Sequence, residues 1–331
     1  FRDRVVLVTG GTRGLGLLLA RHLACEGARL ALVARDRREL EIAAGDLAVY
    51  GVEVLPIEAD LTVDGDPERA VEETVRAFRR LDVVINNAGV IQVGPLDSLT
   101  LEDFDVAMAT HFRGPLRLIL AALPHLEASD AGRLVNVSSI GGRVAVPHLA
   151  AYCASKFALT GLSEALRAEL AERGIAVTTV TPGLMRTGSF LHARFKGRRR
   201  RELDWFGVAS SLPLLTMDAE RAAGKILDAC RSGRATLTLT PQARAAEIAN
   251  RLFPGTAAKV TEWVAALLPA PAGEGGDGAA VPGHRIRSRW VPSALTVLGE
   301  RAAGRHRELP LSATLRGGRD VARSRKADPV R

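Results

Sequence analysis

Two side chains four positions apart, Tyr152 and Lys156, have the chemistry to move a proton. They fall in a helical pattern, where residues at i and i+4 lie on one face. A phenol with a reference pKa of about 10 is a poor acid or base at neutral pH, and a nearby ammonium group lowers that pKa by favouring the phenolate. The spacing therefore indicates acid–base chemistry at Tyr152. The alternative is an ordinary pair of residues on a helix surface.

A glycine-rich turn follows the first apolar run of the chain. Val5–Val8 leads into Thr9-Gly10-Gly11-Thr12-Arg13-Gly14-Leu15-Gly16, and then into the apolar stretch Leu17–Leu23. Glycines at 10, 14 and 16 let the backbone approach a pyrophosphate, whose charge is met by free N–H groups and the positive end of the next helix. The strand–turn–helix context favours a dinucleotide site over a merely structural turn.

The spacing of these glycines resembles the T-G-x-x-x-G-x-G turn of the short-chain dehydrogenase/reductase family, and further motifs agree in order. Asn86-Asn87-Ala88-Gly89 is similar to the family's N-N-A-G, and Ser139 stands 13 positions before Tyr152, as the catalytic serine does. Pro182-Gly183, with Thr187 after it, resembles the motif beside the nicotinamide. The resemblance covers about residues 3–240.

This resemblance implies hydride transfer between a nicotinamide dinucleotide and a carbonyl carbon. Tyr152 is then the general acid or base, Ser139 orients the oxygen, and Lys156 tunes the tyrosine and anchors the nicotinamide ribose. The residues expected at the cofactor are Gly10, Thr12, Arg13, Gly14, Leu15, Gly16, Arg35, Asp60, Leu61, Asn87, Ala88, Gly89, Tyr152, Lys156, Pro182, Gly183 and Thr187.

The end of the second strand bears on the choice between NAD(H) and NADP(H). The family's acidic position, which favours NAD, is Ala34 here, and Arg35 follows it. Arg13 in the glycine turn would face the same 2′-phosphate, so NADP(H) is predicted over NAD(H). Asp36 would oppose this if the register shifted by one residue, and Arg35 is alternatively a solvated residue at a helix start.

One departure from the family concerns His111-Phe112-Arg113-Gly114, where N-x-x-G is usual. The family's asparagine helps hold a water in a proton relay to the lysine. His111 could replace it, since histidine both donates and accepts near neutral pH. It could also mark a weakened enzyme or be a packed structural residue.

The connection 182–217 is expected to cover the substrate. It carries much of the chain's aromatic content, including Phe190, Phe195, Trp205 and Phe206, which suggests a bulky hydrophobic ketone or alcohol such as a lipid, acyl chain or steroid-like molecule. The alternative is that these residues only bury the lid against the core. The run Arg198–Arg201 could meet an acidic carrier or anionic lipid, or be a solvated face.

Short β-rich runs alternate with amphipathic stretches, which predicts an α/β Rossmann-type doubly wound sheet of seven parallel strands with helices on both faces. The expected strands are 5–8, 29–33, 52–57, 83–85, 134–137, 177–180 and 236–239, and the expected helices are 14–26, 36–48, 66–79, 101–126, 150–173 and 218–231. Residues 1–240 form the catalytic domain, 241–272 a helical C-terminal extension, and 273–331 a linker and a loosely ordered basic tail. The helix 150–173 is expected to pair subunits in a homodimer or homotetramer.

Composition excludes several classes of protein. With 47% hydrophobic and 25% charged residues, the chain of 331 residues is globular. Residues 284–331 hold 12 basic and 4 acidic residues, which accounts for the whole formal charge of +8, so the neutral body argues against sequence-specific nucleic-acid binding. Three widely spaced cysteines fit neither disulfides nor a metal site, and no secretory or spanning segment is visible, so a cytoplasmic location is expected.

The prediction is an NADP(H)-dependent oxidoreductase that interconverts a ketone and a secondary alcohol. The alternative, prompted by the missing asparagine and the basic tail, is a dinucleotide-binding regulatory or scaffold protein with weakened catalysis. Contact with a membrane surface is open, because residues 260–268 are apolar and a basic tail follows.

Overall fold

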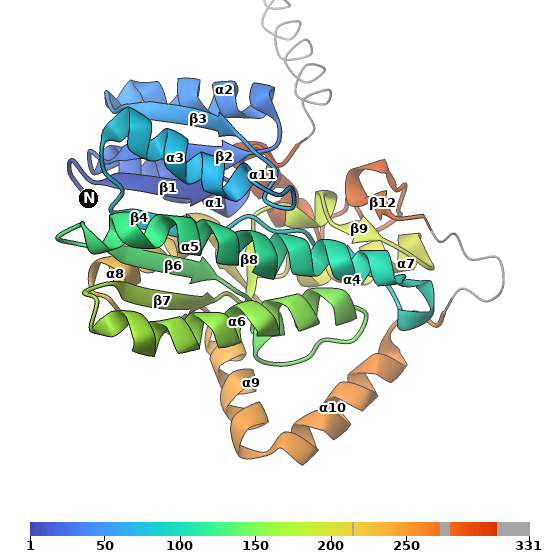
Figure 1. Ribbon diagram of the computed structural model, residues 1–331. Helices are drawn as coiled ribbons and strands as arrows, with labels where there is room; N and C mark the ends of the chain where they lie inside the picture. Colours follow the sequence, from blue (N-terminus) through green and yellow to red (C-terminus); the bar gives the residue numbers. More distant parts are fainter. Residues whose placement is uncertain (214, 272–278, 310–331) are drawn as a thin grey trace, which may run out of the picture.

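The computed structural model describes residues 1–213, 215–271 and 279–309. Its centre is a seven-stranded parallel sheet in the order β11-β7-β6-β4-β1-β2-β3 (Figure 1). The strands are β1 (Val5–Thr9), β2 (Arg29–Ala34), β3 (Val54–Glu58), β4 (Val83–Asn86), β6 (Arg133–Val137), β7 (Ala176–Thr181) and β11 (Thr236–Thr238). The predicted strand set and the doubly wound fold are confirmed.

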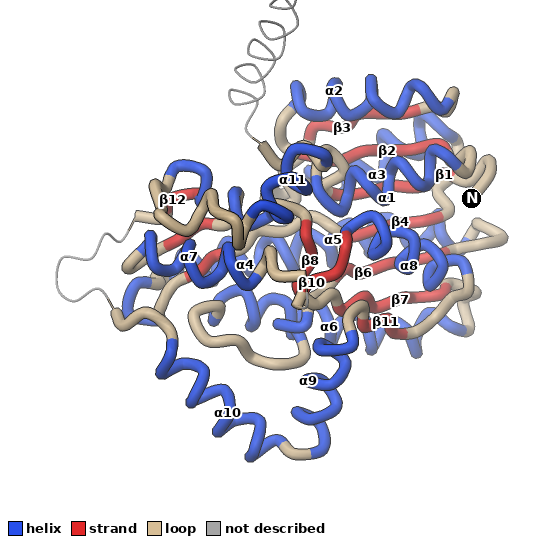
Figure 2. The backbone as a smooth tube through the Cα atoms, turned by 180° about the vertical axis from the view of Figure 1, so that it is seen from behind, coloured by secondary structure: helices blue, strands red, loops and turns tan. Residues whose placement is uncertain are grey.

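Helices cover both faces of the sheet, as Figures 1 and 2 show from opposite sides. One face carries α3 (Asp66–Phe78), α4 (Leu101–Met108), α5 (Gly114–Glu127) and α6 (Ala150–Ala171), and the other carries α1 (Gly14–Cys25), α2 (Arg37–Leu47) and α8 (Ala219–Arg231). Alternate residues of each central strand enter opposite apolar cores: Val6 and Val8 pack with α1, and Val5 and Leu7 pack with α3 and α5. Because both sheet faces are covered, the strands are nearly uninterrupted apolar runs.

The stretch 101–126 was predicted as one helix, and the structure divides it. A π-helical turn, Ala109–Arg113, separates α4 from α5, and Pro115 stands just after the junction. A π turn inserts an extra residue into the helical repeat. This wider turn carries His111, which is fully buried.

The lid between β7 and α8 has small elements of its own. It contains β8 (Leu184–Arg186), β9 (Arg194–Phe195), α7 (Arg199–Ala209) and β10 (Thr216–Asp218), with the 3-10 turn Ser189–Leu191 between β8 and β9. β9 joins β5 (Gln92–Val93) and β12 (Val281–Pro282) in a second, three-stranded sheet. A buried ion pair of 2.5 Å from Lys196 Nζ to Asp103 Oδ2 ties the lid to α4.

Two helices follow the last strand, as predicted: α9 (Pro241–Leu252) and α10 (Pro254–Leu267). They form a hairpin that projects from the body, and α10 contains no buried residue (Figure 1). No helix within the described ranges is long and apolar enough to cross a membrane.

The expected loose order of residues 273–331 is wrong for residues 279–309. There β12 pairs with β9, and α11 (Val297–Arg305) packs on the lid, with Ala302, Ala303 and Val291 buried. Only small residues fit here, since a side chain at Gly188 would collide with Ala303. The weak apolar periodicity of this segment hid the contact from sequence reasoning. Residues 272–278 and 310–331, also part of that prediction, lie outside the described residues.

Candidate active site

The glycine turn lies at the carboxyl end of β1, where the backbone leaves no room for side chains. Gly10 and Gly14 have φ of +65° and +52°, and a Cβ on Gly16 would stand 2.0 Å from the Gly10 carbonyl oxygen. Asn87 fixes the turn from β4, because its Nδ2 donates to the carbonyls of Thr9 (3.0 Å) and Gly10 (3.3 Å). The structure thus brings the glycine turn and the Asn86–Gly89 motif together into one cradle.

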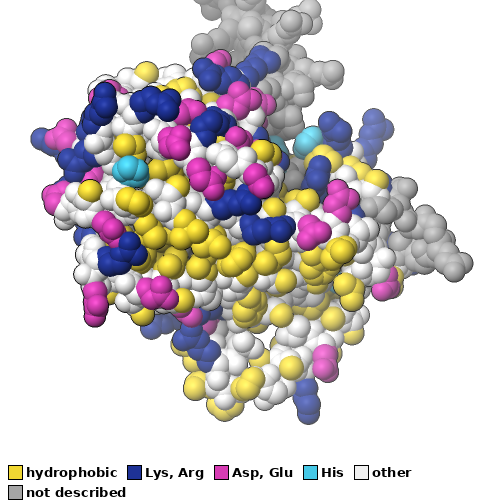
Figure 3. Space-filling view, in the orientation of Figure 1, with side chains coloured by type: hydrophobic (Ala, Val, Ile, Leu, Met, Phe, Trp, Pro, Cys, Tyr) yellow, Lys and Arg dark blue, Asp and Glu magenta, His cyan; other side chains and the backbone are white. Residues whose placement is uncertain are grey.

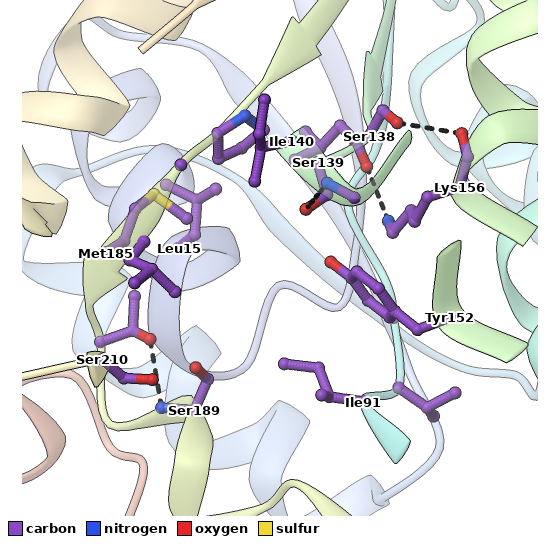
Figure 4. A pocket seen from close by; sticks show the side chains of 18 of the residues that line it. Leu15, Ile91, Ser138, Ser139, Ile140, Tyr152, Lys156, Met185, Ser189 and Ser210 are labelled. Carbon is purple, nitrogen blue, oxygen red and sulfur yellow. Dashed lines mark hydrogen bonds between the residues drawn. The ribbon is translucent and has the colours of Figure 1, made fainter. Parts of the chain in front are cut away.

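Ser139, Tyr152 and Lys156 also meet, at the ends of β6 and α6 (Figure 4). The Tyr152 hydroxyl points toward Ser139, and Lys156 Nζ lies 5.9 Å from the centre of the Tyr152 ring. Lys156 Nζ donates to the Val137 carbonyl oxygen at 2.9 Å, which fixes the ammonium group beneath the phenol. Two separate motifs therefore meet at one wall of a cavity.

The pKa values of Tyr152 and Lys156 both depart from their ordinary values. Burial raises the pKa of Tyr152 to about 12, although the hydrogen bond with Ser139 opposes this. Burial also lowers the pKa of Lys156 to about 7. Withdrawal from water is the largest cause of both shifts. Tyr152 is neutral here, a proton donor, and Lys156 gains or loses a proton near neutral pH.

His111 has no free ring nitrogen in this arrangement. Its Nε2 accepts from the Val90 backbone N–H at 3.0 Å, so Nδ1 carries the proton and donates to Ser155 Oγ at 2.7 Å. Burial, and the nearby Lys156 charge, hold the pKa of His111 well below its usual value. The imidazole therefore joins the loop after Gly89 to the first turns of α6, and its ring lies edge-on to Tyr152 at 5.4 Å.

A cavity of about 750 Å³, where the adenosine half of a dinucleotide is expected, includes Arg13, Arg35 and Leu61. Arg13 Nη1 lies 3.1 Å from Glu39 Oε1, and the Thr12 hydroxyl donates to the same carboxylate at 3.0 Å. Glu39, on α2, borders this cavity and was not among the predicted residues, because it stands four positions after Arg35 and outside every recognised motif.

Three charged residues near the end of β2 have partners within the chain. Asp36 is the N-cap of α2 and accepts from the Glu39 N–H at 3.0 Å, so it caps the helix. Arg35 is largely exposed, with Nη1 3.9 Å from Asp60 Oδ2. Asp60 also accepts from the backbone and hydroxyl of Thr62.

A second cavity of about 460 Å³ holds the Tyr152 hydroxyl and continues to the glycine turn. Of the apolar lid residues, Leu184, Met185, Trp205 and Phe206 line it. Phe190 and Phe195 instead lie in the lid's own core, fully buried. The lid therefore contributes apolar side chains both to this cavity and to its own core.

The predicted Pro182, Gly183 and Thr187 line this same cavity. A side chain at Gly183 would stand 2.4 Å from the Thr240 hydroxyl. Thr187 is buried and accepts from the Ser189 backbone N–H at 3.1 Å, which shapes the start of the lid.

Glu308 is a further residue at the glycine turn that sequence reasoning did not find. It arrives from the C-terminal segment, is buried, and has its carboxylate oxygen where a Cβ of Gly14 would be, 2.2 Å away. No sequence motif marks it, because it stands about three hundred residues after the turn that it contacts. Within the described ranges no group of three or more His, Cys, Asp or Glu could hold a metal ion.

A parallel sheet of this order, with a glycine turn after its central strand and a tyrosine and lysine on the facing helix, defines a Rossmann-type nicotinamide-dinucleotide oxidoreductase. The chain belongs to the short-chain dehydrogenases, whose family profile matches residues 4–195. It is accordingly an enzyme that acts on alcohol or ketone groups with a nicotinamide dinucleotide.

Individual relatives agree with this placement. The chain is 32% identical over 220 residues to an uncharacterized oxidoreductase of Thermotoga maritima, covering 66% of this chain and 86% of the relative. It is 35% identical over 189 residues to the 2-(R)-hydroxypropyl-CoM dehydrogenase of Xanthobacter autotrophicus, covering 56% and 76%. A blue fluorescent protein from a metagenomic library, solved with NADPH, superposes with a TM-score of 0.61 at 28% identity, covering 72% and 96%.

Proposed function

We propose that this protein is an NADP(H)-dependent oxidoreductase that interconverts a bulky hydrophobic ketone and its secondary alcohol. The observation that carries the proposal is the Tyr152 hydroxyl, which faces an apolar cavity continuous with the glycine turn. The proton donor and the cofactor cradle therefore share one space.

In the reducing direction Tyr152 donates its proton to the carbonyl oxygen, and Ser139 donates a hydrogen bond to the same oxygen. A neutral phenol with a pKa of about 12 is in the correct protonation state for this step. Lys156, with a pKa of about 7, is suited to supply the proton that Tyr152 gives up. The nicotinamide ring, when bound, supplies or accepts the hydride. In the oxidising direction its positive charge favours the phenolate.

The residues of the cradle fit a dinucleotide in most respects. Gly10 and Gly16 carry no side chain into the cavity that they line, and the side chains of Thr187, Tyr152 and Lys156 border the nicotinamide side. His111 is assigned a positioning role, because its two ring nitrogens are already engaged.

The preference for NADP(H) rests on Arg13 and Arg35, which border the adenosine cavity where the 2′-phosphate would lie. The absence of an acidic residue at Ala34, and the use of Asp36 as a helix cap, support the same choice. A structural neighbour was solved with NADPH.

A hydrophobic substrate is supported by the lining of the cavity. Ile91, Val146, Leu149, Trp205 and Phe206 surround the space beyond Tyr152. Few polar groups reach this part of the site, so specificity would come from shape and apolar contact.

A homo-oligomer is supported by a band of hydrophobic side chains over α4, α5 and α6 (Figure 3). Leu120 and Phe157 are exposed there, at 57% and 43% of their surface. Contiguous exposed apolar surface of this kind is typical of subunit contacts.

The experiment is turnover of NADPH on a panel of ketones, comparing the wild-type protein with Tyr152→Phe. The chain offers a matched control, Tyr50→Phe, because Tyr50 is the only other tyrosine and is exposed. Tyr152→Phe should lose turnover on the order of a thousandfold, the usual scale for a general acid, and still bind NADPH, while Tyr50→Phe keeps both. NADPH binding without turnover in the wild type would favour the regulatory alternative.

A further inference from the structure

The glycine turn already has a partner from this chain's own C-terminal segment. The Gly14 backbone N–H donates to the His306 carbonyl oxygen at 2.8 Å, at the start of α1. The Glu308 carboxylate lies against the same glycine, and its Oε2 is 3.9 Å from Arg13 Nε. A dinucleotide's pyrophosphate uses this same location, the N–H groups at the start of the helix.

We propose that residues 306–309, here named the C-terminal gate, close the pyrophosphate subsite and must move away before a dinucleotide binds. This inference rests on the proposed function and adds regulation of cofactor access to it. Glu308 lines both the cavity of Tyr152 and a neighbouring cavity of about 620 Å³, while Arg13 borders both of these and the adenosine cavity. The gate therefore stands between the two halves of the cofactor site.

The closed gate is held by specific contacts. His192 Nε2 donates to the Glu308 carbonyl oxygen at 2.8 Å, and Arg307 Nη2 lies 2.5 Å from Asp46 Oδ1. Upstream, α11 is anchored by the small residues Gly299 and Ala303 against the lid. The gate is thus attached to α2 and to the lid, the two elements on either side of the cofactor.

Two features of the closed gate are energetically unfavourable, so a ligand can displace it. Arg307 has φ of +57°, an unfavourable conformation for a residue with a side chain. Glu308 is buried, and burial raises the pKa of its carboxyl to about 7. A ligand that binds only the open protein can therefore shift the equilibrium between the closed and the open gate.

The charged groups around Glu308 determine how opening of the gate depends on pH. Arg13 of the turn favours the ionised carboxyl and Glu39 of α2 opposes it. His192 of the lid is neutral, because burial lowers its pKa to about 4, and His306 of the gate is likewise lowered. Arg307 is paired with Asp46.

Opening returns Glu308 to its ordinary pKa of 4.5, so the open state releases a proton between pH 4.5 and about 7. Opening then becomes easier as pH rises through this window, by at most about tenfold per pH unit, and changes no further above it.

Two substitutions in the full chain separate a gate from a fixed negative charge. Glu308→Ala removes the side chain that fills the subsite, and should tighten NADPH binding on the order of tenfold. Glu308→Gln keeps the shape and mimics the protonated, closed form, so at pH 8 it should bind NADPH more weakly than the wild type. Tightening by both substitutions alike would show a simple repulsion between charges and overturn the gate.

Two controls accompany these substitutions. Adenosine 2′-monophosphate is a ligand that lacks a pyrophosphate, and Glu172→Gln is an acid-to-amide change at an exposed residue at the C-terminal end of α6. If the gate operates, the monophosphate binds all variants with equal affinity, and Glu172→Gln behaves as the wild type. Raising the pH from 5.5 to 7.5 should tighten NADPH binding more in the wild type than in Glu308→Gln. The 2′-phosphate of NADPH titrates in the same pH range, and the pH dependence measured with Glu308→Gln serves to subtract that contribution.

Hydrogen exchange gives a reading that does not depend on substitutions. The His306 and Glu308 amides donate to Ala302 and Ala303 at 2.8 Å, so NADPH should accelerate their exchange if the gate opens. Slower exchange would make residues 306–309 part of the liganded site and contradict the proposal. Equal NADPH affinity in wild type, Ala and Gln variants with normal turnover refutes the gate alone, whereas absence of dinucleotide binding in all three refutes the proposed function as well.

Discussion

Removal of Arg13 should reduce the preference for NADPH over NADH. A hydrogen bond from an arginine to a phosphate contributes about 1.5–3 kcal/mol. Arg13 must first leave Glu39, and that pair, with side chains 34% and 28% exposed, is worth about 0–1 kcal/mol. The net contribution is about 1–2 kcal/mol, so Arg13→Ala should weaken NADPH binding about 5- to 30-fold relative to NADH.

The other groups of the same subsite should respond in order of their exposure and charge. Arg35 has 65% of its side chain exposed, so Arg35→Ala should cost less than about 1 kcal/mol, under fivefold. Glu39→Gln removes a carboxylate that both competes for Arg13 and repels a 2′-phosphate, and should raise the preference for NADPH. Arg173→Ala, on the far end of α6, is the control.

The assay is the dissociation constant of each dinucleotide, from nicotinamide fluorescence. The ratio of the two constants isolates the 2′-phosphate, because any effect of Arg13 on the pyrophosphate or on Glu308 acts on both cofactors. Equal weakening of NADPH and NADH by Arg13→Ala would refute the assignment of this arginine to the 2′-phosphate.

Three further predictions concern the scaffold of the site. Gly16→Ala should abolish dinucleotide binding and lower the Tm, since its Cβ would stand 2.0 Å from the Gly10 oxygen, whereas Gly45→Ala, with no atom within 4 Å, should stabilise α2 by about 0.5–1 kcal/mol. His111→Asn should leave the pH profile of kcat unchanged above pH 6.5, because burial holds the pKa of His111 well below that value and the ring is neutral there; a shifted profile would support a proton relay through its side chain. Asp82→Asn should cost about 2 kcal/mol at pH 7 by denaturant unfolding, and the difference should shrink as pH falls below 3.8.

The prediction for Asp82 follows from its burial beside the start of β1, where the Val5 N–H donates to its carboxylate. Burial favours the protonated form, but hydrogen bonds from Arg80, Ser129 and the Val5 N–H outweigh it and lower the pKa of Asp82. A lowered folded-state pKa contributes stability above the unfolded value of 3.8, and this is lost as pH falls through the folded-state pKa. A difference between variants that persists undiminished at low pH would contradict this reasoning.

The sequence was sufficient for the parts of the molecule that local pattern determines. β-rich runs such as 5–8 and 83–85, and the glycine turn between β1 and α1, follow from apolar content and from positions that tolerate no side chain. Tyr152 and Lys156 share a helix face because of their spacing alone.

Contacts between distant segments were beyond the sequence. Glu308 meets Gly14 only through the packing of α11 on the lid, and Glu39 reaches Arg13 only because α2 follows β2 closely. The burial of Tyr152 and Lys156, which shifts the pKa of each, is likewise a property of the fold that the sequence does not show.

The role of Tyr152 in hydride transfer can be followed with NADPH deuterated at both C4 positions and a hydrophobic ketone, with mass spectrometry of the alcohol that forms. The wild-type protein and Tyr50→Phe should place one deuterium on the carbinol carbon, and Tyr152→Phe should form the labelled alcohol on the order of a thousandfold more slowly. Labelled alcohol formed equally well by Tyr152→Phe would contradict the assignment of Tyr152 as the proton donor of this site.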